Sequence, residues 1–131
     1  MRQTLPKSNI LRGYKAFSKV INHGVFFSGP HIACYMLKHE KPGEQGKVVV
    51  GFSVPKKKIP LAVHRNRIRR LMREAVRKHP FEFAEKTTMK KYFVELVVMY
   101  RSGHSKEMNT FTQSIVEQEW MQIQKQAEAL L

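Results

Sequence analysis

The sequence predicts an α/β fold, a single-domain α–β sandwich in which a helix, three strands, a helix, a strand and a helix build around a mainly four-stranded sheet. Three observations predict it. A basic segment with helical apolar periodicity occupies residues 60–78, two strongly apolar β-like runs flank it at residues 48–54 and 92–100, and the chain shows neither internal repeats nor a linker. Because 131 residues are most simply one domain with one core, residues 1–131 are expected to form a single domain.

The N-terminal part is expected to form one helix followed by two strands. Residues 1–7 have the composition of a flexible basic tail. Residues 11–22 repeat apolar side chains on one helical side, and Gly24 favours the end of that helix. Residues 25–28 and 31–37 are typical of two strands joined by a Gly-Pro turn. The apolar side of the helix carries Tyr14, Phe17, Val20 and Ile21.

Two of the predicted strands have distinguishable faces because side chains alternate along a strand. In the second strand one face carries Ile32, Cys34 and Met36, and the other carries Ala33, Tyr35 and Leu37. A loop is expected at residues 38–47. In the third strand one face carries Val48, Val50, Phe52 and Val54. Gly51 and Ser53, on the opposite face, leave room for a close neighbour.

A basic turn and an amphipathic helix follow the third strand. Pro55 cannot donate to a sheet ladder and ends the strand, whereas Pro60 suits a first helical position. No side chain of the usual capping type precedes the helix. One helical side is apolar and carries Ile68, Leu71, Met72, Ala75 and Val76. The opposite side carries Arg65, Asn66, Arg67, Arg69, Arg70, Arg73 and Arg77.

The C-terminal part is expected to supply the last strand and the last helix. Residues 81–91 fit either a short helix or a loop, and residues 92–100 form the most apolar strand. Ser105 can cap a final helix. The apolar stripe of this helix is Met108, Phe111, Ile115, Val116, Trp120, Ile123 and Ala127.

The net charge of +14 lies almost wholly in the first part of the chain. Residues 1–91 contain 21 Lys and Arg against five Glu, whereas residues 92–131 contain three against five. Such asymmetry indicates a polyanionic partner. Arg offers a planar fork matched to phosphate oxygens and Asn can bond sugar or base edges, so the arginine side favours nucleic-acid binding over a merely solvated face. A membrane surface is the competing explanation, but the helix lacks the apolar-side Trp and Phe of interfacial helices.

The composition disfavours several other classes of function. The chain has no Asp, and only Glu117 and Glu119 are spaced like a site pair, whereas two-metal nucleases need several converging carboxylates. The six His lack ligand spacing, so neither a metal site nor a catalytic residue is expected on the protein. Cys34 is the single cysteine and fits a buried apolar role in a reducing compartment. No run is long enough to span a membrane.

The region around the basic helix carries a long and specific motif. Its parts are Gly51-Phe52-Ser53-Val54, Lys56-Lys57, Ala62-Val63, Arg65-Asn66-Arg67, Arg69-Arg70 and Arg73-Glu74. This motif resembles the signature of the bacterial ribonuclease P protein subunit family. Pro55 and Pro60 depart from the small residues that the family often has there, and both should stiffen the turn. The resemblance extends from the first helix through the last strand, and it implies a left-handed crossover between the third and fourth strands.

The resemblance implies the protein component of a cytoplasmic RNA enzyme that removes the 5′ leader of precursor tRNA, with the chemistry on the RNA subunit. Mg²⁺ would be held mainly by that RNA and the substrate. The implied partners are the catalytic ribonuclease P RNA and precursor tRNA, with no membrane and no obligate protein partner. A non-catalytic structural RNA-binding protein of ribosomal type is the alternative.

The resemblance also implies two RNA-binding surfaces. The residues that would dock on the catalytic RNA are Lys56, Lys57, Arg65, Asn66, Arg67, Arg69, Arg70 and Arg73. A cleft between the first helix and the sheet would hold the leader, lined by Phe17, Ile21, Tyr35 and, as a further candidate, Phe52. Ile21 departs from the aromatic residue that is common in the family. Ordinary core packing is the alternative role for each aromatic side chain.

Overall fold

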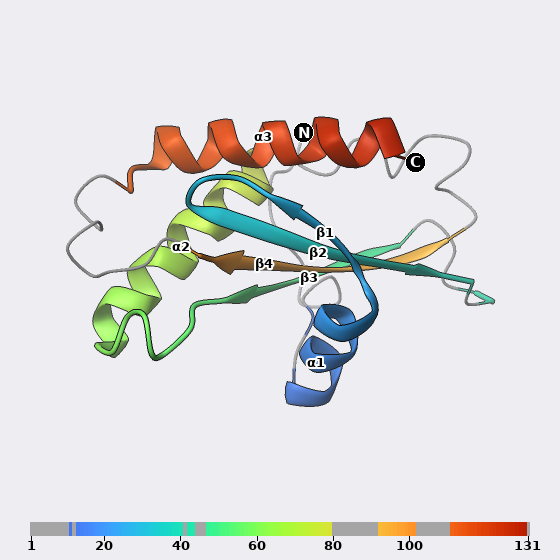
Figure 1. Cartoon of the computed structure of the whole chain (residues 1–131), viewed down its shortest axis with the longest axis horizontal. Helices are drawn as coiled ribbons and strands as arrows, with labels where there is room; N and C mark the ends of the chain where they lie inside the picture. Colours follow the sequence, from blue (N-terminus) through green and yellow to red (C-terminus); the bar gives the residue numbers. More distant parts are fainter. Residues whose placement is uncertain are drawn as a thin grey trace.

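The order of helices and strands agrees with the sequence prediction. The computed structural model describes residues 11, 13–40, 42–43, 47–79, 92–101 and 111–130. Its elements are α1 (Tyr14–His23), β1 (Val25–Ser28), β2 (Ile32–His39), β3 (Val48–Ser53), α2 (Ala62–Lys78), β4 (Phe93–Tyr100) and α3 (Gln113–Leu130), shown in Figure 1. The predicted tail at residues 1–7 and the ambiguous segment at 81–91 lie outside the described residues.

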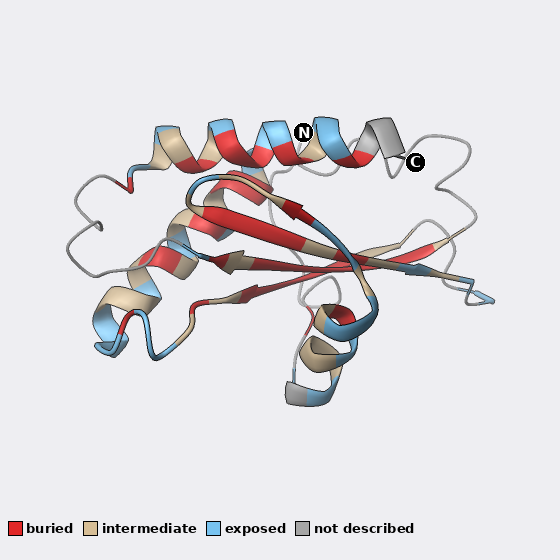
Figure 2. Cartoon of the chain, viewed as in Figure 1, coloured by how far each residue is buried: buried red, intermediate tan, exposed pale blue. Residues whose placement is uncertain are grey.

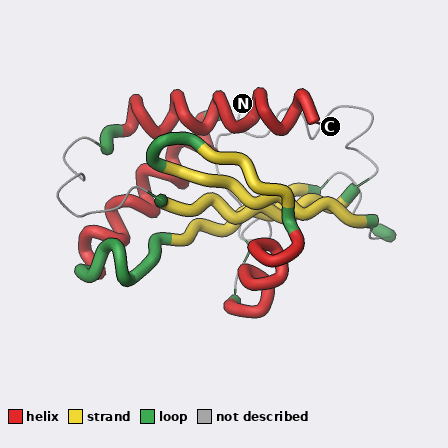
Figure 3. The backbone as a smooth tube through the Cα atoms, in the orientation of Figure 1, coloured by secondary structure: helices red, strands yellow, loops and turns green. Residues whose placement is uncertain are grey.

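The four strands form one mixed sheet in the order β1-β2-β4-β3 (Figure 3). β1 pairs antiparallel with β2, and β2 pairs antiparallel with β4. β3 and β4 are parallel neighbours, and α2 lies between them in the chain. A parallel pair needs such a crossover connection, which explains why the basic helix must pack on a face of the sheet. The left hand of the crossover stays a prediction from the resemblance.

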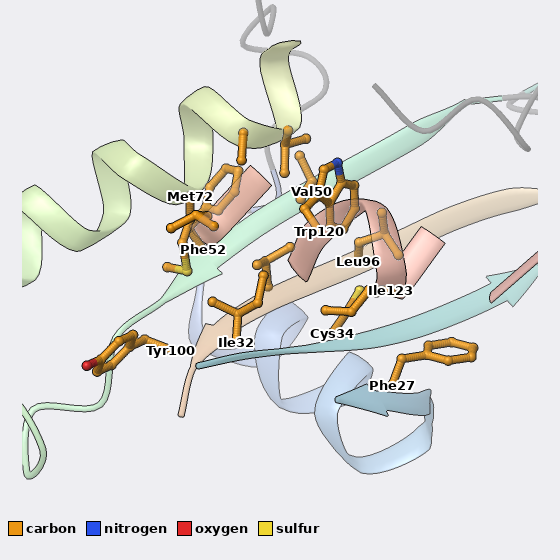
Figure 4. Packing of buried hydrophobic residues seen from close by; sticks show 14 of the residues in the cluster. Phe27, Ile32, Cys34, Val50, Phe52, Met72, Leu96, Tyr100, Trp120 and Ile123 are labelled. Atoms are coloured by element: carbon orange, nitrogen blue, oxygen red, sulfur yellow. The ribbon is translucent and has the colours of Figure 1, made fainter. Parts of the chain in front are cut away.

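Helices cover the two faces of the sheet unequally (Figure 1). α2 contacts β3 and α3, and α3 also contacts β1 and β2, so these two helices form a layer on one face. α1 contacts β2 and β4 from the other face. The larger hydrophobic core lies between the sheet and the α2–α3 layer (Figures 2 and 4). A smaller core lies under α1. None of the helices in the described part of the chain is long and apolar enough to cross a membrane.

Alternation along the strands assigns side chains to these two cores as expected. Ile32 and Cys34 belong to the larger core (Figure 4). Their strand neighbour Met36 belongs to it as well, whereas Tyr35 and Leu37 pack against the smaller one. Burial raises the pKa of the Cys34 thiol to about 12, because the low-dielectric interior disfavours the thiolate. Cys34 is therefore a buried apolar residue and a poor nucleophile at neutral pH.

Some predicted boundaries are wrong. β2 continues to His39, because the last two residues still pair with β4, so the expected loop starts later. α2 starts at Ala62 with Leu61 as its N-cap, two residues after Pro60. A helix running on from Ser105 is also wrong: Phe111 and Thr112 are not helical, and Ser105 itself lies outside the described residues.

The cap that starts α3 at Gln113 comes from Thr112. The Thr112 hydroxyl accepts a hydrogen bond from the Ile115 amide at 3.4 Å, which satisfies one of the free N–H groups of the first turn. Phe111, the residue before the cap, is fully buried and packs edge-on against Tyr100 with the ring centres 5.0 Å apart. The apolar stripe expected of a longer helix is thus partly supplied by this extended residue.

α3 holds the C-terminal end of α2. The His79 carbonyl accepts hydrogen bonds from Trp120 Nε1 at 2.7 Å and from Gln124 Nε2 at 2.9 Å. His79 Nε2 lies 2.7 Å from a Glu117 carboxylate oxygen. Burial alone would raise the pKa of Glu117, but the hydrogen bond with His79 and the positive charge of Lys78 outweigh it, and the pKa lies below its usual value.

The second carboxylate of the sequence pair faces a different element. Glu119 is buried against the β1–β2 turn, where its Oε1 accepts from the His31 amide at 2.8 Å and from the Ile32 amide at 3.1 Å. Its Oε2 lies 2.5 Å from His31 Nδ1. Glu117 and Glu119 therefore bind separate partners on the α2 side and the sheet side of the helix, and they do not form a joint site.

The Glu117 contact predicts a defined pH dependence of stability. Because the folded-state pKa lies below the usual value of 4.5, the stabilisation is fully present above that value and is lost as the pH falls through the folded pKa. We expect Glu117→Gln to flatten the acid limb of the free energy of unfolding, measured by urea titration from neutral to acid pH. Glu40→Gln, at an exposed position, should leave that limb unchanged. Superimposable acid limbs for Glu117→Gln and the wild-type chain would contradict this account.

Candidate nucleic-acid interface

The arginine side of α2 faces away from the core because the opposite side is packed. Ile68, Met72, Ala75 and Val76 are buried against the sheet and α3. Of the predicted RNA-binding residues on this helix, Asn66, Arg70 and Arg73 are exposed, and the others are partly exposed. The predicted amphipathic division of the helix is therefore confirmed, whereas RNA binding by these side chains stays a prediction.

Arg65, Arg69, Arg73 and Arg77 follow one another at four-residue spacing and form a row along α2. The arginines at the two ends of this row form hydrogen bonds within the protein. Arg65 Nη1 donates to the carbonyls of Ile59 at 2.9 Å and Pro60 at 2.5 Å, so this guanidinium holds the turn that leads into the helix. At the other end Arg77 forms an ion pair with Glu74 at 2.6 Å, and this hydrogen bond lowers the pKa of the Glu74 carboxyl. The bonds at both ends relieve part of the repulsion expected within a row of like charges.

The middle of the row is directed to solvent. Arg69 Nη1 donates to Asn66 Oδ1 at 3.0 Å, which aligns two predicted RNA-binding residues on neighbouring turns. Arg73 is exposed, and its guanidinium carbon lies 5.7 Å from the centre of the Phe52 ring. A guanidinium held against a ring keeps N–H groups free for phosphate oxygens. The middle of α2 thus presents cations in fixed positions.

Hydrogen bonds hold the basic turn before α2, which runs from Pro55 to Ile59. The Lys58 and Ile59 amides donate to the Pro55 carbonyl, each at 3.1 Å, and Ile59 is fully buried. Lys58 Nζ donates to the Arg101 carbonyl at 2.7 Å and ties the turn to the end of β4. Lys56 and Lys57 remain exposed on this turn. The chain therefore holds the two predicted lysines beside the start of the arginine helix.

A groove of about 490 Å³ lies between α1 and the end of β3. Its lining residues are Gly13, Phe17, Ser18, Ile21, Asn22 and Ser53. Phe17 sits directly on Gly51, since a Cβ atom added at Gly51 would collide with Phe17 Cζ. The prediction that Gly51 leaves room for a close neighbour is confirmed. Two of the predicted cleft residues, Phe17 and Ile21, thus share one groove.

The other two predicted cleft residues have different positions. Tyr35 is on the same face of the sheet and packs against the α1 core, but it does not line the groove. The placement of Phe52 in this cleft is wrong. Phe52 is only 8% exposed and belongs to the larger core on the opposite face, because alternation along β3 points it toward α2 when Gly51 points toward α1.

Sequence reasoning missed a charged network under α1. Glu95, with a side chain only 9% exposed, accepts a hydrogen bond from Lys19 Nζ at 3.1 Å and lies 2.8 Å from His39 Nε2. The signal was available as a lone carboxylate within the apolar run of β4. Among the described residues, no three His, Cys, Asp or Glu side chains converge in a way that could hold a metal ion.

These features define a small basic α/β protein with an exposed guanidinium helix and a groove on the opposite face of the sheet. The structure of the Staphylococcus aureus RNase P protein is similar, with a TM-score of 0.66 at 20% identity over 92% of this chain and 96% of the other. The RNase P protein of Thermotoga maritima gives a TM-score of 0.62 at 20% identity over 88% and 94% of the two chains. The predicted fold class is confirmed.

The sequence comparisons establish the family. The family model described as ribonuclease P matches residues 5–128, and the chain therefore belongs to the ribonuclease P protein family. The ribonuclease P protein component of Chlorobaculum tepidum is 42% identical over 76 residues, which are 56% of this chain and 49% of the relative. That of Nitrosomonas eutropha is 41% identical over 76 residues, 58% and 61% of the two chains. The match thus spans about half to three-fifths of these relatives.

The contact between Phe17 and Gly51 predicts a strong effect of a single methyl group. We expect Gly51→Ala to displace the Phe17 ring and to lower the free energy of unfolding by about 1–3 kcal/mol, the usual cost of overpacking a core. Ser53→Ala, on the same face of β3, should change it by less than about 0.5 kcal/mol. Urea unfolding checks both variants, and equal stability of Gly51→Ala and the wild-type chain would show that Phe17 is not held against the strand.

Proposed function

We propose that this chain is the protein component of ribonuclease P. It binds the catalytic RNA through α2 and the basic turn, and it binds the 5′ leader of precursor tRNA in the groove beside α1. The observation that carries this proposal is the family match over residues 5–128, combined with an arginine helix whose middle residues are exposed. Endonucleolytic removal of the leader then gives the mature 5′ end of the tRNA.

The chemistry of the two surfaces supports a different role for each. Exposed guanidinium and ammonium groups displace condensed counterions from RNA phosphates, which contributes sequence-independent affinity. The groove offers the Phe17 ring and the Ile21 side chain, and stacking on an aromatic platform contributes about 1–3 kcal/mol per base and tolerates any sequence. A leader site must tolerate sequence in this way, because leaders of different tRNAs differ.

The proposal assigns the chemistry to the RNA. The chain has no Asp, and the carboxylates with described contacts, such as Glu95 and Glu119, are bound to His, Lys or Arg side chains or to backbone amides. Mg²⁺ would therefore be held mainly by the RNA and the substrate, where it supplies charge stabilisation during phosphodiester cleavage. The protein neutralises RNA phosphates and so lowers the Mg²⁺ concentration that the RNA needs in order to fold and to bind the substrate. The proposal includes a cytoplasmic location and no obligate protein partner.

Reconstitution tests the proposal directly. The purified chain, added to a bacterial ribonuclease P RNA at low Mg²⁺, should stimulate removal of the leader, and the chain alone should cleave nothing. A heat-denatured sample of the chain is the control. Binding without stimulation would instead indicate a structural RNA-binding protein of ribosomal type, and cleavage by the chain alone would indicate an autonomous nuclease.

The exposed middle of α2 predicts a change in the salt dependence of RNA binding. We expect Arg70→Ala combined with Arg73→Ala to weaken binding and to flatten the slope of log affinity against log salt by about 0.7 to 0.9 for each phosphate that is no longer neutralised. Filter binding over a salt series measures the slope. Lys125→Ala, at an exposed position of α3, is the matched control and should keep the wild-type slope. A wild-type slope in the double variant would place the RNA elsewhere.

A further inference from the structure

Phe26 is an exposed aromatic residue on the edge strand β1. It is 50% exposed, whereas the next residue, Phe27, is buried in the larger core. Since side chains alternate along a strand, Phe26 faces the α1 side of the sheet. Val25, which is 53% exposed, shares the opposite side with Phe27. A large exposed ring at a sheet edge is a liability for association, so its position calls for a physical reason.

The side chains of Tyr35 and Arg101 lie beside the Phe26 ring. Tyr35 of β2 lies with its ring centre 5.0 Å away at an interplanar angle of 44°. Arg101, which follows β4, reaches across the sheet so that its guanidinium carbon lies 6.0 Å from the ring centre. Arg101 is exposed, and its own carbonyl accepts the hydrogen bond from Lys58. The Phe26 ring is thus held in place beside the positive charge of Arg101, and Arg101 is in turn linked to the basic turn through Lys58.

The strand register places this ring in line with the groove. Phe26 pairs with Tyr35, Tyr35 pairs with Val97, and Val97 pairs with Gly51, on which Phe17 sits. These residues form one row perpendicular to the strands on the α1 side. Three strand spacings of about 4.8 Å separate β1 from β3, so the row extends roughly 14 Å across the sheet. Val97, in the middle of the row, is fully buried under α1, so a strand of nucleic acid has to pass beside this helix to reach the aromatic rings at both ends of the row.

We propose that Phe26, with Arg101 beside it, is a stacking and phosphate-binding position for single-stranded RNA, which extends the leader groove across the sheet to its β1 edge. This inference deepens the proposed function and rests on it for the identity of the RNA as a leader. The half-exposed ring takes the face of one base, and Arg101 takes the adjacent phosphate. A leader long enough to reach from the groove to Phe26 then gains affinity that a short leader does not.

Charge selects RNA over a protein partner as the occupant. Arg101 is exposed, and the turn that Lys58 ties to it carries the exposed Lys56 and Lys57, so this end of the sheet is positively charged. A polyanion with flat apolar bases matches an aromatic ring flanked by cations. A second copy of the same basic chain would bring like charges together, and β1 is only four residues long, which limits edge pairing.

A binding assay without the catalytic RNA tests the position. Fluorescein-labelled single-stranded oligonucleotides of about 4 to 16 nucleotides, the usual range of site sizes, are titrated with the full chain and followed by anisotropy. The wild-type affinity should rise with length until the row is filled. Phe26→Leu should lose about 5- to 100-fold at the longer lengths and nothing at the shortest, while Phe26→Trp should retain the rise. Arg101→Gln should flatten the salt slope by about 0.7.

The matched control is Val25→Ala, which alters an equally exposed residue of the same strand on the opposite side and should bind as the wild type. Wild-type affinity of Phe26→Leu at every length would overturn the inference, as would a wild-type chain that binds none of the oligonucleotides. A change in sedimentation of Phe26→Leu with unchanged RNA binding would overturn it too, in favour of contact between copies. Failure of the reconstitution with Phe26-dependent oligonucleotide binding intact would count against the leader-processing function alone.

Discussion

The packing of the apolar side of α2 against the sheet and α3 is the constraint on which the exposed arginine side of this helix depends. Each buried side chain of the size of Ile68, Met72 or Val76 contributes about 1.5–3 kcal/mol, whereas each pair of like charges four residues apart costs about 0.2–0.5 kcal/mol. Burial therefore outweighs the repulsion among the arginines. Once the apolar side is fixed, the guanidinium groups have to face outward. Hydrogen bonds from Arg65 and Arg77 at the two ends of the row reduce the repulsion further.

The unequal cover of the sheet determines where a single-stranded ligand can lie. α2 and α3 cover the face of the sheet from which Phe52 projects. The rings of Phe52 and of Trp120 on α3 are therefore buried in the larger core. Among the described elements, the other face receives α1 alone, a helix of ten residues that contacts β2 and β4. Both the groove at Phe17 and the exposed ring of Phe26 are on this less covered face. The same periodicity of two that builds the larger core thus leaves a platform on its reverse side.

The sequence was sufficient to predict the order of the elements, the division of α2 and the close approach at Gly51, because each depends on local periodicity or on a missing side chain. Phe52 was misassigned to the cleft because a motif gives residue identity, whereas the side of the sheet follows from strand alternation. The role of Arg65 in the turn and the burial of Glu95 by Lys19 and His39 depend on contacts between distant segments. The start of α3 was misplaced because an apolar stripe can continue into an extended residue such as Phe111.

The Glu119 contact has a consequence for the order in which a newly made chain can become native. The carboxylate that accepts from the His31 and Ile32 amides lies 88 and 87 residues further along the chain. During translation the hairpin of β1 and β2 emerges long before this carboxylate, and its turn amides must bond to water until α3 arrives. Contacts of such sequence separation slow folding, because a large loop has to close before they form. Docking of α3 is therefore the step that gives the turn amides of the hairpin their hydrogen-bond acceptor and completes the larger core.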